Sequence, residues 1–238
     1  MRILGGALVL AGAVCCLGLS NSALASPIGT MNLANCGGGG VTVTPTTISW
    51  SPAGSVAGTG CIITGLGTNV TWSGGTLLNN VTGNIMDLTA GGGTVDHFID
   101  LPAPPASPAL DFALSGFAPG SSNTNCASAT GAGSTCSVIA GSPFVLTFDG
   151  VGTTTVSLSA FGNVSDANGS TAWHGGFSTQ FNMTPLQIQE SFARQGSLQS
   201  TYSGQFTLTT VPEPISAGLI GTGLVALALI KRPRKNRG

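Results

Sequence analysis

The chain has 238 residues, of which 37 are glycine and only 6% are charged, and its formal net charge is −1. Residues 26–211 contain seven acidic residues and one basic residue, Arg194, so this segment carries a net charge of −6. It has no basic surface to hold phosphates, which disfavours nucleic-acid binding. The length suits one substantial domain or two small ones. The low charge and the recurrent Val, Leu, Ile and Phe residues favour a folded core over disorder.

Residues 1–25 have the pattern of a secretory signal peptide. Arg2 supplies a positive charge, Ile3 to Leu19 form an apolar run, and Ala23-Leu24-Ala25 matches the small-x-small pattern that precedes a cleavage site. We therefore expect export, with an ectodomain over residues 26–211. An uncleaved N-terminal anchor is the alternative.

Four cysteines remain after the predicted signal peptide: Cys36, Cys61, Cys126 and Cys136. An even number in an exported chain indicates two disulfides. Three pairings exist, and Cys36–Cys61 with Cys126–Cys136 is preferred, because each bond stays within one region and the second closes a Gly/Ser-rich loop. A zinc site is the alternative, but the chain has no C-x-x-C pair with a neighbouring His. No metal site and no cofactor are predicted.

One cluster in the first half of the ectodomain resembles a site, namely Asp96-His97-Phe98-Ile99-Asp100. On a regular strand, Asp96 and Asp100 lie on one face and His97 on the other, so we expect a surface strand. A calcium or catalytic site is the alternative. His174, before Gly175-Gly176, is expected in a loop. The chain has no G-x-S-x-G, H-E-x-x-H or P-loop motif, and no catalytic residue is predicted.

Three tryptophans, Trp50, Trp72 and Trp173, could stack on sugar rings if they were exposed. A carbohydrate-binding module that acts on exopolysaccharide through exposed Trp is therefore an alternative function. Burial in the core is the more common fate of Trp.

Alternation of apolar and polar residues with period two predicts strands over 110–116, 144–148, 154–160 and 198–210. The residues expected to be buried are Leu110, Phe112, Leu114, Phe144, Leu146, Phe148, Val156, Leu158, Ala160, Leu198, Tyr202, Phe206 and Leu208. One buried and one wet face are typical of antiparallel sheets. We expect an all-β fold, an antiparallel, jelly-roll-like β-sandwich with one short connector helix. The alternative is that the Pro-rich connector, 102–108, divides a smaller N-terminal sheet from the rest of the ectodomain.

Local signals predict a hairpin and a helix in the second half of the ectodomain. Asn168-Gly169 favours a tight type I′ turn. The segment around it is only weakly similar to a calcium loop, because its glycine is in the fourth position and not the sixth. Thr184 and Gln187 form a capping box, Pro185 suits the first helical position and Gly196 can end the helix, which predicts a helix over 185–195.

The C-terminal segment, residues 212–238, has three parts. Pro212, Glu213 and Pro214 come first, and an uncharged apolar span, Ile215 to Ile230, follows. The basic residues then come together at the end: Lys231, Arg232, Arg234, Lys235 and Arg237. This order predicts a C-terminal transmembrane helix with its basic end in the cytoplasm. A buried core helix is the alternative.

This three-part segment resembles the PEP-CTERM sorting signal of Gram-negative bacteria. The resemblance implies processing at Pro212-Glu213-Pro214 by an exosortase, a membrane-embedded cysteine transpeptidase. It also implies a temporary membrane anchor, a basic cytoplasmic stop and export linked to exopolysaccharide. The expected partners are the exosortase, the membrane and, as a candidate ligand, exopolysaccharide. The protein would be anchored in the inner membrane before processing and then reach the cell surface or the extracellular space.

Residues 93–211 are more loosely similar to an ectodomain that recurs with this signal and has no assigned activity. The similar segments are Phe112-Ala-Leu-Ser-Gly, the two cysteines Cys126 and Cys136, Gly141-Ser-Pro-Phe-Val-Leu-Thr, and Thr184-Pro-Leu-Gln. The expected function is that of an exported cell-surface or extracellular-matrix protein whose ectodomain is structural or binding and non-catalytic.

Overall fold

The described residues form an all-β domain of antiparallel sheets with one α-helix, as the alternation predicts. The structure, a computed structural model, describes residues 26–73, 75–89, 94–101 and 110–209. The predicted signal peptide, the Pro-rich connector and the predicted sorting segment lie outside these residues. Within the described part of the chain, no helix is long and apolar enough to cross a membrane.

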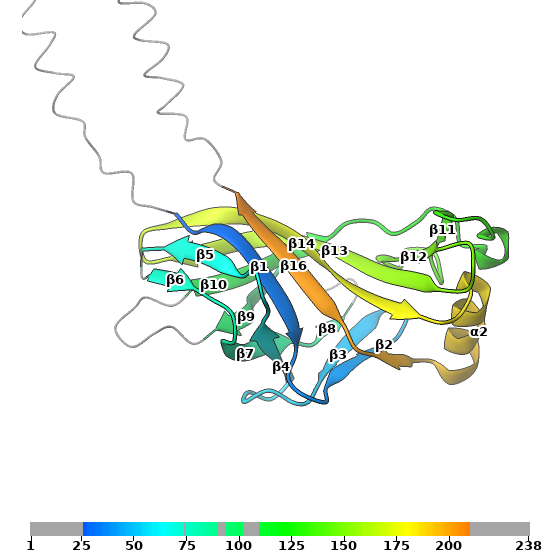
Figure 1. Ribbon diagram of the computed structural model, residues 1–238, viewed down its shortest axis with the longest axis horizontal. Helices are drawn as coiled ribbons and strands as arrows, with labels where there is room; N and C mark the ends of the chain where they lie inside the picture. The colour runs from blue at the N-terminus through cyan, green and yellow to red at the C-terminus, as the bar shows by residue number, and fades with distance from the viewer. Residues whose placement is uncertain (1–25, 74, 90–93, 102–109, 210–238) are drawn as a thin grey trace, which may run out of the picture.

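The main sheet closes into a barrel, which corrects the sandwich prediction. The long strand β13 (Thr154–Asp166) pairs along its whole length with β14 (Gly169–Phe181), and its second half pairs with β10 (Leu110–Phe117) on the other side. Among the described residues, eight strands follow one another round the closed part (Figure 1). They are β1 (Ile28–Asn35), β4 (Thr59–Thr64), β7 (Thr82–Met86), β9 (Val95–Leu101), β10, β13, β14 and β16 (Ser203–Thr209).

Other strands extend this sheet or form a second one. β5 (Asn69–Trp72) and β6 (Gly75–Leu77) make a hairpin beside β1, while β12 (Phe144–Phe148) and β11 (Thr135–Cys136) continue beside the first half of β13. The second sheet has the order β15 (Leu198–Ser200), β2 (Gly40–Val43), β3 (Thr47–Ser51) and β8 (Leu88–Thr89). It packs on the extension formed by β12, β13 and β14, so the described residues have a two-layer arrangement beside the barrel.

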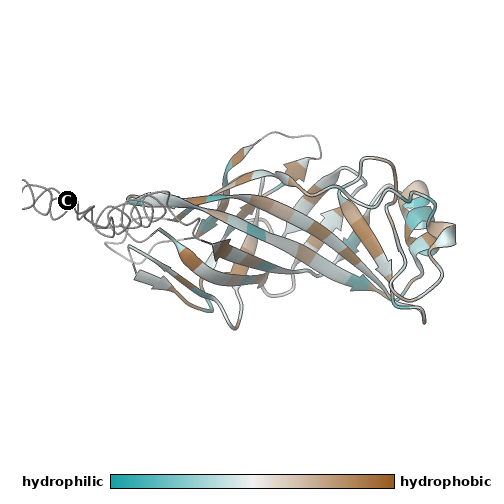
Figure 2. Ribbon diagram, turned by 90° about the horizontal axis from the view of Figure 1, so that it is seen from above, coloured by the Kyte–Doolittle hydropathy of each residue, from teal (hydrophilic) through white to brown (hydrophobic). Residues whose placement is uncertain are grey.

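The residues predicted to point inward are buried, which confirms the period of two. Phe112, Leu146, Leu158 and Phe206 are each at most 2% exposed, and alternating hydropathy is visible along the long strands in Figure 2. The same alternation suits a sandwich, whose buried face meets a second sheet, and a barrel, whose buried face lines its own interior. The pairing of β10 with β13 decides between them.

Glycines make room for large aromatic rings inside the barrel. Gly162 of β13 lies opposite Trp173 of β14, and Gly175 lies opposite Phe206 of β16. A Cβ atom at Gly162 would lie 2.9 Å from the Trp173 ring, and one at Gly175 would lie 2.7 Å from the Phe206 ring. The two rings therefore rest directly on backbone, and their centroids are 5.2 Å apart.

Phe177 of β14 joins the barrel interior to the second sheet. Its ring centroid lies 5.2 Å from that of Phe206 in the barrel and 4.9 Å from that of Trp50 on β3. Tyr202 packs edge-on against Trp50, with centroids 4.6 Å apart. An apolar cavity of about 30 Å³ remains between the layers, bordered by Phe177, Trp50 and Tyr202. The barrel core and the two-layer region are thus one continuous core.

The single strand predicted over 198–210 is two strands in the structure. β15 pairs with β2 in the second sheet, whereas β16 pairs with β14 and β1 in the barrel. The chain passes from one sheet to the other at Thr201 and Tyr202. Both sheets bury alternate residues, so the alternation alone does not reveal the change of sheet.

The hairpin predicted at Asn168-Gly169 is present, but its turn is different. Asp166 and Gly169 pair directly, so the turn consists of Ala167 and Asn168, and neither has a positive φ. The Asp166 carboxylate instead accepts hydrogen bonds from the backbone N–H groups of Asn168 and Gly169. The type I′ prediction is wrong because this carboxylate stabilises another turn.

The predicted helix is α2 (Pro185–Gln195), and both arms of its capping box form. The Thr184 hydroxyl accepts from the Gln187 N–H, and the Gln187 side chain accepts from the Thr184 N–H. Gly196 ends the helix with φ 74°. Ile188 and Phe192 are buried. The helix lies beyond β12 at one end of the domain (Figure 1).

The two ends of the described domain lie on neighbouring strands. Gly29 near the start of β1 pairs with Leu208 near the end of β16. Figure 1 shows the start of β1 and the end of β16 at the end of the molecule away from α2. The segments that precede and follow the domain therefore attach to the same end.

Replacing Gly162 with Ala tests the packing of rings on backbone. The new Cβ would lie 2.0 Å from the Ala113 carbonyl oxygen as well as against the Trp173 ring, so we expect unfolding free energy to fall by about 1–3 kcal/mol. Gly152→Ala is the control, because no atom lies within 4 Å of its Cβ position. Urea unfolding measures both variants, and an equal effect would contradict the packing.

Replacing Tyr202 with Phe tests the junction between the layers. The Tyr202 hydroxyl is buried without a hydrogen-bond partner among the described residues, and burial raises the pKa of this phenol. Removing an unpaired buried hydroxyl is neutral or stabilising, so the urea midpoint should stay the same or rise. A loss of more than about 1 kcal/mol would instead reveal a hydrogen bond to this group.

Candidate functional site

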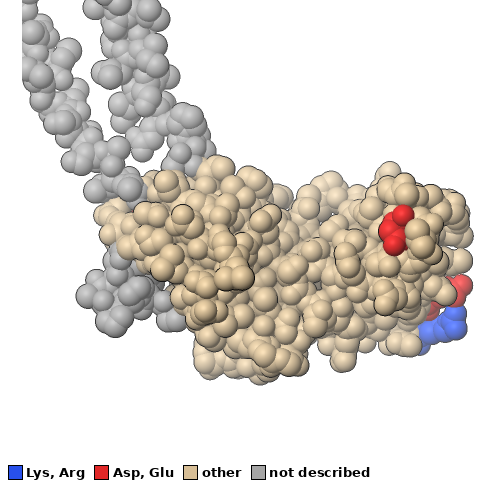
Figure 3. All heavy atoms as spheres, in the orientation of Figure 1, with Lys and Arg blue, Asp and Glu red and all other residues tan. Residues whose placement is uncertain are grey.

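The described surface carries very few charges. In the view of Figure 3, charged atoms occur only toward the end that carries α2, and the rest of this face is uncharged. Arg194, the single basic residue between 26 and 209, forms an ion pair with Glu190 on the same helix. The domain therefore offers uncharged groups to any partner over most of this face.

Several carboxylates stabilise turns and loops. Asp149 accepts hydrogen bonds from the backbone N–H groups of Gly152, Val151 and Thr153, which lowers the pKa of Asp149 to about 2. Burial alone would raise the pKa of Asp166, but hydrogen bonds from the Ser73 hydroxyl and nearby N–H groups lower it. The carboxylates of Asp149 and Asp166 are therefore engaged in hydrogen bonds that stabilise turns.

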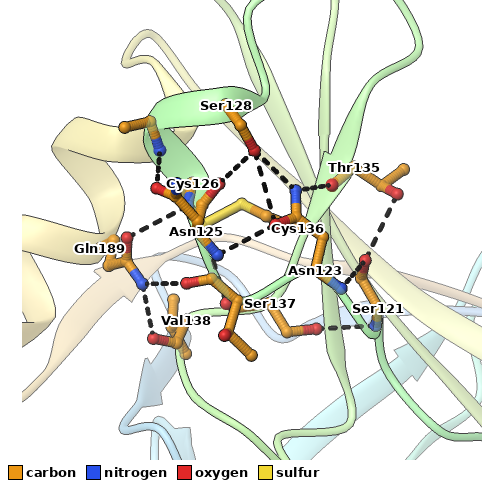
Figure 4. The surroundings of a disulfide bond; sticks show 12 residues. Ser121, Asn123, Asn125, Cys126, Ser128, Thr135, Cys136, Ser137, Val138 and Gln189 are labelled. Atoms are coloured by element: carbon orange, nitrogen blue, oxygen red, sulfur yellow. Dashed lines mark hydrogen bonds between the residues drawn. A yellow bond between two sulfur atoms is a disulfide. The ribbon is translucent and has the colours of Figure 1, made fainter.

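The two preferred disulfides are present. Cys36, just after β1, bonds to Cys61 on β4, with the Cα atoms 5.6 Å apart. Cys126 bonds to Cys136 within the segment that connects β10 to β12, with the Cα atoms 5.3 Å apart (Figure 4). The zinc alternative is wrong, because all four cysteines are paired in these two disulfides.

Gln189 of α2 fixes the second disulfide loop to the helix. Its side-chain amide donates to the Thr124 and Val138 carbonyls at 2.9 Å each, and its oxygen accepts from the Cys126 N–H (Figure 4). Asn123 adds a bond across the loop to the Thr135 carbonyl. A loop with almost no regular structure is thus held by a covalent bond and by one helix.

The three tryptophans are buried, which overturns the idea of exposed Trp as a sugar platform. Trp50 is 6% exposed, Trp72 5% and Trp173 1%. The Trp173 indole N–H also donates to the Ala113 and Asn163 carbonyls inside the barrel wall. None of the three rings is available to stack on a ligand.

The Asp96-His97-Asp100 cluster lies on a bulged surface strand. His97 has φ 54°, and the register between β9 and β10 shifts beside it. The bulge interrupts the alternation that the sequence suggested, so Phe98 and Ile99 are both buried while Asp96, His97 and Asp100 are all exposed.

The bulged segment does not build a site from these three residues. His97 Nδ1 lies 3.1 Å from Asp111 Oδ1 on the neighbouring strand, as an exposed pair. Asp100 does not join this pair but borders a hollow of about 340 Å³, together with Asn84 and Ser55. Among the described residues, no three His, Cys, Asp or Glu side chains are placed to hold a metal ion.

A hollow of about 610 Å³ on the outside of the barrel is the best candidate site. It lies over β13, β14 and β16, where β13 changes partner from β10 to β12. The lining consists of Ala118, Ser157, Leu158, Ser159, Ala160, Phe161, His174, Gly175, Gly176, Phe177, Ser178, Gln205 and Thr207. Its size is within the usual range for ligand pockets.

Strand pairing arranges the outward side chains of the hollow in rows. Phe161, His174 and Thr207 form one row, and Ser159, Gly176 and Gln205 form the next. Gly176 contributes no side chain at the centre of its row. Phe161 is 47% exposed and lies over Gly116 of β10, whose Cβ position is 3.2 Å from the ring. The hollow thus combines an exposed aromatic ring with hydroxyl, amide and imidazole groups.

No pattern in the sequence predicts this hollow. His174 was expected in a loop, but it lies within β14 as an outward residue. One residue of the hollow is marked in the sequence: Phe161 is a large apolar residue at a position of the alternating strand that is expected to point outward. The register between β13, β14 and β16 brings these residues together, and this register is not encoded in any one segment.

No protein-family model, curated protein or solved structure matches this chain. The resemblance of residues 212–238 to a PEP-CTERM signal stays a prediction.

Replacing Cys126 and Cys136 together with Ser tests the second disulfide. We expect unfolding free energy to fall by about 2–4 kcal/mol, because the unfolded chain loses a constraint. Urea unfolding measures the loss, and non-reducing peptide mapping of the wild type checks the pairing. Gln189→Ala is a companion variant that should weaken the loop but leave the disulfide intact. Free thiols in the wild type would contradict the pairing.

Proposed function

We propose that this chain is an exported surface protein that an exosortase processes, with a non-catalytic ectodomain that is structural or binding. The signal peptide directs export, and the C-terminal apolar span anchors the chain in the inner membrane until Pro212-Glu213-Pro214 is processed. The ectodomain then acts at the cell surface or in the extracellular matrix.

The neighbouring ends of the domain are the observation that carries this proposal. The start of β1 pairs with the end of β16, through Gly29 and Leu208, so the described domain begins and ends on neighbouring strands. This pairing supports the proposal, because a signal peptide before β1 and a sorting segment after β16 would be joined to one end of the barrel. A domain held at the membrane from one end presents its remaining surface away from the lipid. This arrangement suits a chain with a membrane-directed segment at each terminus.

Two further features support export. The two disulfides suit an oxidising compartment. Small uncharged polar residues lie on the outer faces of the strands, for example Ser157, Ser159 and Thr207. Their hydroxyl groups hydrate the surface without adding charge. Such a surface suits contact with neutral material outside the cell.

Replacing Pro212 and Glu213 with Ala tests the sorting step. We expect the protein to stay full-length and membrane-bound, because the enzyme loses its recognition sequence while the apolar span remains. Mass spectrometry of the C-terminus, in a host that carries an exosortase, measures processing. Thr210→Ala with Val211→Ala is the neighbouring control and should be processed normally. A wild-type exported form that still ends at Gly238 would contradict exosortase processing.

A further inference from the structure

The hollow over β13, β14 and β16 has the chemistry of a binding site for an uncharged ligand. No Asp, Glu, Lys or Arg is among its lining residues. A cationic ligand would lose hydration there without gaining an oppositely charged partner, and an anionic ligand would meet no basic side chain other than the His174 imidazole, so a charged ligand loses free energy of hydration with little return. A neutral polar ligand does not meet this cost. The lining of the hollow therefore favours a ligand without net charge.

The backbone under the hollow is not available to a peptide strand. β13 is paired on both edges, with β14 on one side and with β10 and β12 on the other. β14 lies between β13 and β16 over this region, and β16 lies between β14 and β1. Recognition by strand addition needs an open edge, so a ligand in the hollow must be held by side chains.

The side chains that face the hollow combine an aromatic surface with hydrogen-bonding groups. Phe161 exposes 47% of its surface; the Thr207 hydroxyl lies in its own row and the Ser159 hydroxyl in the next row. Gln205 also faces the hollow, and its side-chain nitrogen donates to Asn32 Oδ1 at 3.2 Å. Sugar rings present both hydroxyls and apolar C–H faces, so this mixture matches them.

The hollow is also set back from the attached end of the domain. Ser159 lies seven residues from Asp166 at the β13–β14 turn, and the Asp166–Gly169 turn lies beside Ser26. At about 3.3 Å per residue, this separation is roughly 20 Å along the strand. A chain molecule outside the cell could reach the hollow while the domain is still anchored.

We propose that this hollow binds a neutral oligosaccharide, with Phe161 as the ring that stacks on a sugar face. The Ser159 and Thr207 hydroxyls and the Gln205 amide supply hydrogen bonds, and Gly176 leaves space for the ligand. This inference rests on the proposed function, because it assigns a ligand class to the exported domain.

Calorimetric titration of the purified full-length protein tests the site. The probes are cellohexaose, maltohexaose and mannohexaose, with hexameric oligogalacturonate as the acidic comparison. We expect at least one neutral probe to bind more tightly than the acidic one. Phe161→Ala should weaken that binding about tenfold or more, as expected for an aromatic anchor, while Phe161→Tyr should keep it.

Val151→Ala is the matched control, because it removes an exposed apolar side chain, 93% exposed, that does not line the hollow. It should bind as the wild type does. Ser159→Lys is the second test variant, for the case that Phe161→Ala does not fold. Its long charged side chain fills the hollow, so it should abolish binding. Urea midpoints report whether each variant is folded.

The proposal is overturned if no neutral probe binds, if oligogalacturonate binds best, or if Phe161→Ala and Ser159→Lys both bind like the wild type. Competition by an uncharged extended peptide of similar length would also overturn it, in favour of a peptide site. The sorting proposal has a separate readout in the C-terminal mass. A processed protein that binds no sugar contradicts only the hollow, and an unprocessed protein that binds sugar contradicts only the sorting step.

Discussion

The contact of the Phe177 ring with both layers is the interaction on which the rest of the domain depends. Phe177 lies against Phe206 and Phe98 in the barrel and against Trp50 and Tyr202 at the second sheet. Space for this ring exists because Gly204, on the neighbouring strand, has no side chain; its Cβ position is 3.0 Å from the ring. Aromatic packing of this kind contributes through buried area and ring geometry together. It unites a closed barrel and a separate sheet in one core.

The outer hollow is a consequence of the same strands. On β13 and β14, Leu158 and Phe177 are buried inside, and Ser159 and Gly176 therefore point outward beside them. Strands fixed by a packed core hold such outward groups more precisely than a loop would. The partner change of β13, from β10 to β12, opens the surface at this point. The candidate site thus depends on the barrel closure and on the extension beyond it.

The two ends of the domain use different means of stabilisation. At the end where the chain enters and leaves, β1 and β16 pair directly, and the Ser73 hydroxyl bonds to Asp166 between two hairpins. At the other end, little sheet remains, and the Cys126–Cys136 bond, Gln189 and the capped helix α2 take its place. The disulfide thus stabilises a segment in which the strand pairing among the described residues is limited to the short β11 beside β12.

Features that depend on residues close together in the chain are predictable from the sequence. The period of two showed which residues of β10, β12 and β13 are buried, and the capping residues placed α2 to the residue. The even cysteine count and the short spacing favoured the disulfide pairs that the structure contains. Each of these signals acts over a few residues, or over one loop, and is independent of the remaining fold.

Three other features follow from contacts between distant parts of the chain. They are the closure of the sheet, the change of sheet at Thr201 and Tyr202, and the burial of the three tryptophans. Such contacts also decide the bulge at His97 and the meeting of Phe161 with Gln205 at one hollow. These features arise from pairing between strands far apart in the chain, such as β1 with β16. A pattern of period two is identical for a sandwich and for a barrel. Whether the sheet closes into a barrel therefore depends on which edge strands pair with each other and on which aromatic rings pack against glycine.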